Sequence, residues 1–455
     1  MNMGTQGLRA KVIASTKLST LRFMSDVALR LISTVVLTRL LAPEIYGVFA
    51  VVLVYAYVLA MVSDLGLRSV VLTYENQPDE EFLSTCWTVS ILRGVLIALL
   101  SVGIAGVIGN LQSNGVFGPD SPYAAPDLPW ALVGLGIATL LAGFQSPVSF
   151  VIEREMKFGR VTLAHVASNL VSLVATIALA IYLRSIWALV LGSMARSLAQ
   201  VTFSFLLFPG PGLRLRLSKG PLKAIIDRGK WIIGHSTMTA ASMSADRLVL
   251  GLVMNSTTFG FYFIARQVVE LVMQFIQSID AQVGLQVFRH LHQTTHAEFK
   301  SNYYRYRLFF DVLAGLSTGG LFVMAPLLVG IVFDDRYAGV APIIQITIWG
   351  AMLIGPILLR SAFSAERRFK QMTILSLVTT VTLWAGLGIT VFLMQSVTAA
   401  LVVIALHRLP EAILCTAMGL KRGWVIWWRE GIGLVFCALG AGIGYVLLNV
   451  WGALT

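Results

Sequence analysis

The chain has 455 residues, of which 57% are hydrophobic and 12% are charged, and its mean hydropathy is +0.80. A soluble domain carries about twice that charged fraction, so the composition excludes a soluble fold. Because a spanning helix needs about 20 apolar residues, a dozen helices leave room for loops but for no large extramembrane domain. The net charge of +12 is explained by basic cytoplasmic loops, in which membrane proteins accumulate Lys and Arg. It does not indicate a nucleic-acid partner here.

Thirteen apolar runs, bounded by charges, Gly or Pro, predict membrane-spanning helices. They lie near residues 18–40, 46–67, 86–109, 129–151, 161–183, 187–208, 231–253, 259–288, 308–332, 341–363, 371–393, 398–418 and 431–453. The three cysteines stand alone in apolar runs without metal-ligand spacing, so we expect no metal ion and no cofactor other than a coupling proton or Na⁺.

The distribution of basic residues predicts the orientation of the chain. With a cytoplasmic N-terminus, the loops that face inward hold 22 Lys and Arg, whereas the opposite loops hold only Arg39, Arg184 and Arg336. Cytoplasmic loops are enriched in Lys and Arg, so we expect a multi-pass protein with its N-terminus in the cytoplasm.

Two pairs of similar segments indicate an internal repeat. Residues 155–158 (EMKF) match 366–369 (ERRF) at an offset of 211, and 40–47 resemble 252–260 at an offset of about 213. Each pair is six spans apart, so both halves enter the membrane in the same direction and are related by an axis along its normal. The sequence therefore predicts an all-α polytopic membrane protein of two parallel-repeat six-helix bundles, with about one extra C-terminal helix.

This pattern gives boundaries for the predicted parts. We expect an N-lobe of helices one to six at 1–208 and a cytoplasmic amphipathic linker at 209–230. A C-lobe of helices seven to twelve follows at 231–418, and the extra helix occupies 419–455.

Charged residues lie inside several spans. Arg22, Asp26 and Arg30 are spaced by four residues and share one helix face. Because a charge at mid-bilayer costs at least about 2.5 kcal/mol, this face is expected to line a watery cavity. The seventh and eighth spans, which the repeat places opposite, carry further charges: Asp246, Arg247, Arg266 and Glu270. Other candidates lie nearer to span ends: Asp64, Asp280, Asp311, Arg196, Arg360, Arg408 and Glu411.

A wall of arginines suits an anionic, phosphate-bearing substrate, because guanidinium groups make bidentate contacts with phosphate oxygens. The candidate substrate-binding residues are Arg22, Arg30, Arg247 and Arg266. The carboxylates of Asp26, Asp64, Asp246 and Glu270 are candidates for binding a coupling ion or for orienting the arginines. Two structural alternatives stay open: that Arg22 extends to the inner interface, as long basic side chains do, and that the pairs clamp helices together.

The segments 37–50 (LTRLLAPEIYGVFA) and 63–67 (SDLGL) resemble the Wzx-type polysaccharide-transport branch of the MOP flippase superfamily, which also contains the MATE transporters. Residues 246–251 (DRLVLG) and 260–265 (GFYFIA) look like their counterparts in the second half. The resemblance covers nearly the whole chain. It implies two bundles in a V that alternates between inward-open and outward-open states.

The resemblance also implies a function. The cargo would be an undecaprenyl-pyrophosphate-linked oligosaccharide, flipped across the bacterial inner membrane for exopolysaccharide or O-antigen export. Membrane lipids and polysaccharide polymerase or export proteins are the implied partners. A MATE-like ion-coupled antiporter for drugs or organic cations is the main alternative, but it should have more unpaired carboxylates. A membrane enzyme is disfavoured, because neither a large outward loop nor a catalytic carboxylate cluster is visible.

Overall fold

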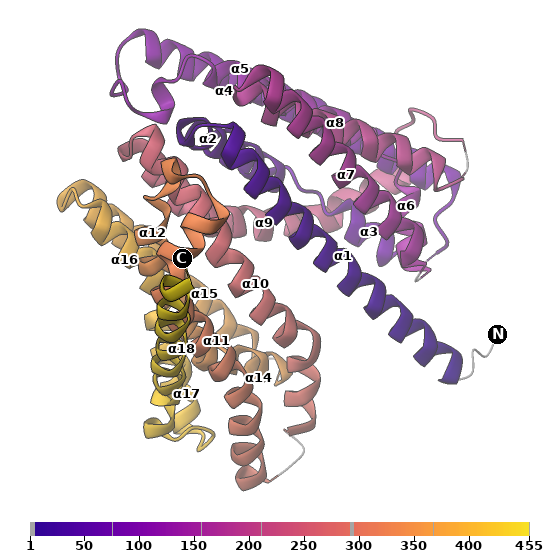
Figure 1. Cartoon of the computed structure of the whole chain (residues 1–455). Coiled ribbons are helices and arrows are strands. Elements are labelled where there is room, and N and C mark those ends of the chain that lie inside the picture. Colours follow the sequence, from indigo (N-terminus) through magenta and orange to yellow (C-terminus); the bar gives the residue numbers. More distant parts are fainter. Residues whose placement is uncertain are drawn as a thin grey trace. The chain divides into compact units, whose positions relative to one another are not determined.

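The computed structural model describes residues 5–74, 76–155, 157–210, 212–291, 295–366 and 368–454, and every regular element in these ranges is a helix. By packing, the chain divides into two compact units, Met1–Thr257 and Thr258–Thr455 (Figure 1). The first unit contains α1 (Thr5–Leu40), α2 (Pro43–Val62), α3 (Leu67–Leu72), α4 (Glu80–Ser113), the 3₁₀ helix η1 (Pro122–Ala124), α5 (Leu128–Gly143), α6 (Val148–Arg154), α7 (Phe158–Leu183), α8 (Ile186–Leu206) and α9 (Lys219–Val253).

The second unit starts just inside α10, after Thr257, with two long helices, and continues with shorter, broken ones. It contains α10 (Ser256–Leu291), α11 (His296–Val332), η2 (Asp335–Tyr337), α12 (Val340–Thr347), η3 (Ile348–Leu353), α13 (Ile354–Ile357), α14 (Leu359–Ala365), α15 (Phe369–Gly388), the π-helical η4 (Ile389–Leu393), α16 (Val397–Leu406), α17 (Leu409–Lys421), η5 (Trp427–Gly431) and α18 (Ile432–Leu454).

Each predicted span coincides with one helix or with a run of consecutive helices. Among the described residues, ten runs are long and apolar enough to cross a membrane, or eleven if α5 and α6, bent by 61°, form one span. The other two predicted spans are α1 and α9, each of which carries seven charged residues. The predicted all-helical, multi-span class is confirmed, and α1 and α9 differ because their charge requires polar surroundings.

The packing boundary falls one helix later than the predicted boundary between lobes. The sequence predicts an N-lobe ending at 208 and a C-lobe from 231, whereas α9 packs along α2 and belongs to the first unit. The packing boundary groups helices that are neighbours in space, whereas the repeat groups helices by their order in the sequence. The lobe boundaries therefore stay a prediction.

Part of the predicted linker is an extended segment, without regular secondary structure, that is fixed to α4. Its backbone N–H groups donate to hydroxyl groups on the first turns of α4: Arg214 to Ser84, Arg216 to Thr88 and Ser218 to Thr85, at 2.9–3.3 Å. These hydroxyl oxygens thus satisfy backbone donors that have no helix or sheet partner. The segment then leads directly into α9.

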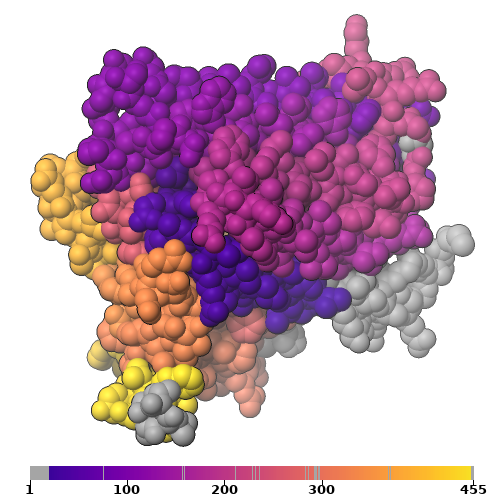
Figure 2. All heavy atoms as spheres, turned by 45° about the horizontal axis from the view of Figure 1, so that its top comes forward, coloured from indigo at the N-terminus to yellow at the C-terminus, as the bar shows by residue number. Residues whose placement is uncertain are grey.

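Two helical hairpins form the body of the first unit. Helix α4 runs beside α5, α7 runs beside α8, and α5 also packs on α8 (Figure 1). Small residues allow the close approach of α4 and α5, since a Cβ atom at Gly143 would lie 2.9 Å from the carbonyl oxygen of Ser90. Helix α1 lies along α7, as Figure 2 shows where the indigo surface meets the magenta one. This contact places the charged face of α1 against α7.

The last helix is an integral part of the second unit. Helix α18 packs closely on α11 through glycines of both helices. A Cβ atom at Gly319 would overlap the carbonyl oxygen of Cys437, and one at Gly440 would lie 2.7 Å from that of Leu316. The predicted extra C-terminal helix thus completes the packing of α11.

A buried ion network lies near one end of the same helix pair. Arg307 on α11 is only 1% exposed and donates to Asp311 at 3.1 Å and to Glu430 beside α18. A neighbouring aromatic cluster includes Phe299, which lies 4.7 Å from Trp424 between ring centroids. Here two carboxylates surround one guanidinium, so the charge of Arg307 is fully compensated within the protein.

The α11–α18 contact predicts a steric test. Replacing Gly319 by Leu should lower the stability of the protein by about 1–3 kcal/mol, because the side chain collides with backbone rather than with a movable side chain. Thermal unfolding of the purified protein in detergent measures the change. The matched control is Gly330→Ala on the same helix, where nothing lies within 4 Å of the new Cβ. It should be neutral or slightly stabilising, and equal melting temperatures for the two variants would contradict the contact.

Candidate functional site

The charged face of α1 forms a polar cluster with α7. The Asp26 carboxylate accepts hydrogen bonds from His165 Nε2 at 3.0 and 3.1 Å and from Asn169 Nδ2 at 2.7 Å. Arg22 Nη2 contacts the other ring nitrogen, His165 Nδ1, at 3.2 Å. His165 and Asn169 are spaced by four residues, so one face of α7 meets the charged face of α1.

Positive charge exceeds negative charge in this cluster. Arg196 on α8 interacts electrostatically with Asp26, Arg30 and Arg22. Asp26 is the single carboxylate in this described set, against three guanidinium groups. Arg30 and Arg196 are exposed, whereas Arg22 and Asp26 are half-buried. The cluster is therefore suited to receive an anion.

The second unit carries a separate cluster of three arginines. Arg266 pairs with Glu270 at 3.1 Å on α10, and Arg360 pairs with Glu411 at 2.6 Å. Glu411 is fully buried and also accepts a hydrogen bond from Thr379 at 2.8 Å. Arg408, at the break between α16 and α17, interacts electrostatically with Glu411, Arg360 and Arg266.

The two clusters share a position in the internal repeat. Arg408 follows Arg196 by 212 residues, an offset between the two that indicated the repeat. Each of these arginines lies on the last span of its predicted six-helix half and faces other arginines of its own unit. The equivalence is confined to this position, since the residues 212 positions before Arg266 and Arg360 are Val54 and Val148.

The remaining predicted carboxylates, Asp64 and Asp246, each accept a backbone hydrogen bond from a residue close by in the sequence. Asp64 accepts a hydrogen bond from the backbone of Gly66 at 2.9 Å, which stabilises a turn in the left-handed region (φ +61°), and Ser236 approaches it at 3.5 Å. Asp246 is 4% exposed and accepts the backbone N–H of Arg247 at 2.8 Å. Arg247 is half-buried on α9. The predicted juxtaposition of Arg22 and Arg30 with Arg266 stays a prediction, because the two units are described separately.

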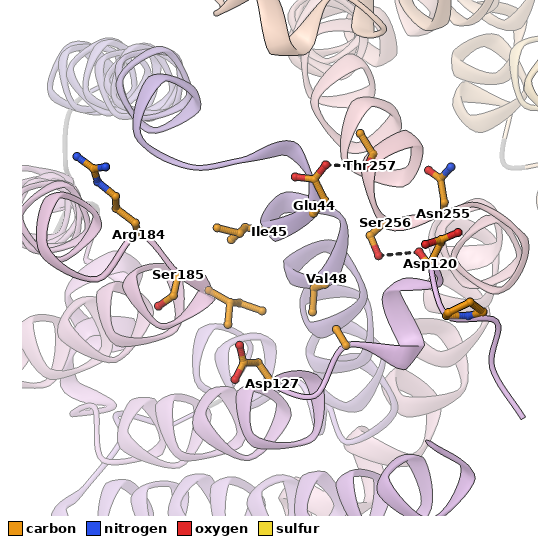
Figure 3. A pocket seen from close by; sticks show the side chains of 13 residues that line it. Glu44, Ile45, Val48, Asp120, Asp127, Arg184, Ser185, Asn255, Ser256 and Thr257 are labelled. Carbon is orange, nitrogen blue, oxygen red and sulfur yellow. Dashed lines mark hydrogen bonds between the residues drawn. The ribbon is translucent and has the colours of Figure 1, made fainter. Parts of the chain in front are cut away.

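Cavities lie in both units. In the first unit a cavity of about 610 Å³ is lined by Glu44, Asp120, Asp127 and Arg184. Figure 3 shows Glu44 bonded to Thr257 and Ser256 bonded to the backbone of Asp120. With three carboxylates to one arginine, this cavity is poorly suited to phosphate. In the second unit a cavity of about 330 Å³ is lined by residues that include Asp280, Arg360 and Arg408.

His165 and Asn169 were not among the residues predicted from the sequence. The prediction relied on charged residues within spans, and neither of these side chains carries a fixed charge. A signal was available, because a histidine and an asparagine four residues apart interrupt an otherwise apolar run. The same criterion did identify Arg196, Arg360, Arg408 and Glu411, but assigned them to span ends rather than to two clusters.

The fold is that of multi-pass membrane transporters. A structure described as lipid II flippase MurJ in an inward closed conformation matches with a TM-score of 0.68 and 11% identity, over 95% of this chain and 98% of that one. An inward-facing multidrug resistance MATE family transporter of the MOP superfamily matches with a TM-score of 0.64 and 14% identity, over 87% and 94%. At these identities the likeness shows the fold alone, and it confirms the predicted fold class.

Sequence comparison gives the family. A family model described as polysaccharide biosynthesis protein matches residues 36–342, and the chain belongs to this family. The lipopolysaccharide biosynthesis protein WzxC of Escherichia coli (strain K12) is 20% identical over 346 residues, which are 74% of this chain and 66% of that protein. The chain thus spans just under two thirds of that relative's length. The predicted resemblance to polysaccharide-transport members of the MOP superfamily is confirmed.

The buried carboxylate of the second cluster gives a stability test. Replacing Glu411 by Gln should destabilise the protein by about 1–3 kcal/mol, because it leaves the Arg360 guanidinium without its buried counter-charge. Thermal unfolding checks this value. The matched control is Glu155→Gln, whose pair with Lys157 is exposed on both sides and should contribute less than about 0.5 kcal/mol. A melting temperature as high as that of the control would show that Arg360 does not depend on Glu411.

Proposed function

We propose that this protein flips polyprenyl-diphosphate-linked oligosaccharides from the cytoplasmic to the periplasmic leaflet of a bacterial inner membrane. The sugar units would serve exopolysaccharide or O-antigen export, and a polymerase or export protein would take them up on the far side. Transport would proceed by alternating access, with the N-terminus of the chain in the cytoplasm.

The observation that carries the proposal is the excess of guanidinium groups among spanning helices. Three arginines and one carboxylate meet on α1 and α8, in a setting where each uncompensated charge costs at least about 2.5 kcal/mol. An anionic ligand supplies the missing negative charge. Guanidinium groups make strong, bidentate and permanently charged contacts with phosphate oxygens, so the diphosphate of a lipid-linked sugar fits the cluster.

Lipid linkage explains how a polar sugar crosses the bilayer. The head group would stay among polar side chains while the polyprenyl tail stays in lipid, so that the sugar avoids hydrocarbon, where an unsatisfied polar group costs several kcal/mol. Binding of the anion would favour the conformation that holds it best. A coupling proton or Na⁺ would be held in the neighbourhood of the candidate carboxylates Asp26, Asp64, Asp246 or Glu270, and no other cofactor is proposed.

The test measures transbilayer movement of fluorescent polyprenyl-diphosphate oligosaccharides in vesicles that contain the purified protein. Arg30→Ala and Arg266→Ala should each reduce the rate at least tenfold, because each removes charged contacts worth about 1.5–3 kcal/mol, while the variants stay folded. The matched control is Arg336→Ala, whose side chain pairs with Asp334 near η2 and should leave the rate unchanged.

Two outcomes would contradict the proposal at different levels. Unchanged rates in both variants would remove Arg30 and Arg266 from the binding site. Movement of no glycolipid by the parent protein, together with ion-driven export of organic cations, would favour the MATE-like antiporter instead.

A further inference from the structure

His165 is held through both nitrogens of its ring. Nε2 lies 3.0 and 3.1 Å from the two oxygens of Asp26, and Nδ1 lies 3.2 Å from Arg22 Nη2. Asn169 donates to the same carboxylate at 2.7 Å. The imidazole thus lies directly between the carboxylate and the guanidinium of one α1 face.

This arrangement permits one protonation state of the ring. A guanidinium has five N–H donors and no acceptor, so its bond to Nδ1 requires a lone pair on that nitrogen. In a neutral imidazole the proton then resides on Nε2, where it is donated to Asp26. The observed contacts therefore describe a neutral His165 with its Nδ1 lone pair occupied by Arg22.

A proton on Nδ1 and the hydrogen bond from Arg22 exclude each other. Protonation would place an N–H donor opposite another N–H donor and a positive charge beside a positive charge. The Asp26 bond would persist, because an imidazolium donates from both nitrogens. Protonation of His165 therefore releases the Arg22 guanidinium, and withdrawal of Arg22 frees Nδ1 for a proton.

We propose that His165 is a proton-binding residue that is linked to anion binding at Arg22, so that the protein takes up a proton when it binds a phosphate-bearing substrate. The proposal rests on the proposed function, because it assumes that Arg22 contacts the anion. It adds the identity of the proton site and the sign of the coupling.

The charges around His165 support proton uptake, rather than proton release, when an anion binds. The charged groups that interact with His165 are Arg22 and Asp26 on α1 and Arg196 on α8, with the neutral Asn169 on its own helix. Arg30 interacts in turn with Arg196. Helix α6 also packs on α7, but its Glu153 carboxylate pairs with Arg68 at 2.7 Å. With three guanidinium groups and one carboxylate, a further positive charge is disfavoured until an anion arrives.

Thermodynamic linkage makes the coupling measurable from either side. If anion binding raises proton affinity, lower pH must tighten anion binding by the same factor. One proton taken up per anion corresponds to a change of at most about tenfold in Kd per pH unit. Between about pH 8 and pH 6, the range in which histidine titrates, the parent protein should therefore bind the anion several-fold more tightly.

The experiment uses the full-length protein in lipid nanodiscs and calorimetry with a short-chain citronellyl-diphosphate N-acetylglucosamine. The diphosphate diester of this probe keeps a fixed charge near neutral pH. Heats measured in two buffers of different ionisation enthalpy give the number of protons taken up per probe bound. We expect proton uptake by the parent protein, and its loss in His165→Gln and in Arg22→Gln, with probe binding weakened but retained.

The matched control is His407→Gln, a histidine at the α16–α17 break whose Nδ1 faces the carbonyl oxygen of Ile404. It should keep the parent's proton uptake. His165→Asn is a second variant in case the glutamine variant does not elute as a single folded species. Probe binding without proton uptake by the parent, or unchanged uptake in both His165 variants, would overturn the proposal and leave the flippase function standing. Absence of probe binding by the parent would instead overturn the anion site of the proposed function, and the proton linkage with it.

Discussion

A guanidinium group inside a membrane protein must find negative charge, and the chain meets this requirement in two ways. Arg307 is enclosed by Asp311 and Glu430, so its charge is compensated permanently and it serves packing. In the part of the chain that the structure describes, Arg22, Arg30 and Arg196 lie in one cluster with a single carboxylate, Asp26. Because transfer of an uncompensated charge from water is so unfavourable, the second arrangement is stable only where water or an anion can enter.

The two arrangements differ in how far the protein itself compensates the charge of the arginines. Both arrangements use arginine, so composition alone cannot distinguish them. The number of carboxylates around each arginine distinguishes them, and this number depends on which helices pack together. The second unit is intermediate. Arg266 pairs with Glu270 and Arg360 pairs with Glu411. Arg408 interacts with Glu411 and with both of these arginines. The two clusters therefore offer an anion different degrees of attraction.

Much of the fold could be predicted from the sequence because hydropathy reports directly on burial in lipid. Each predicted span is a helix or a helical run, including α1, whose regularly spaced charges predict polar surroundings. The bend between α5 and α6 lies at Pro147, a residue type that interrupts helices, but the apolar run continues through it, so hydropathy alone does not show the break. The partners of Asp26 could not be predicted, because His165 and Asn169 lie 139 and 143 residues away along the chain.

The glycine contact between α11 and α18 also bears on how the protein is made. Helix α11 presents a row of residues without side chains, and the surface that fits this row lies on α18, much later in the chain. During synthesis these glycines lack their partner surface until α18 has been made and inserted. The second unit therefore reaches its mature packing late, and until then quality-control proteases can recognise it as incomplete.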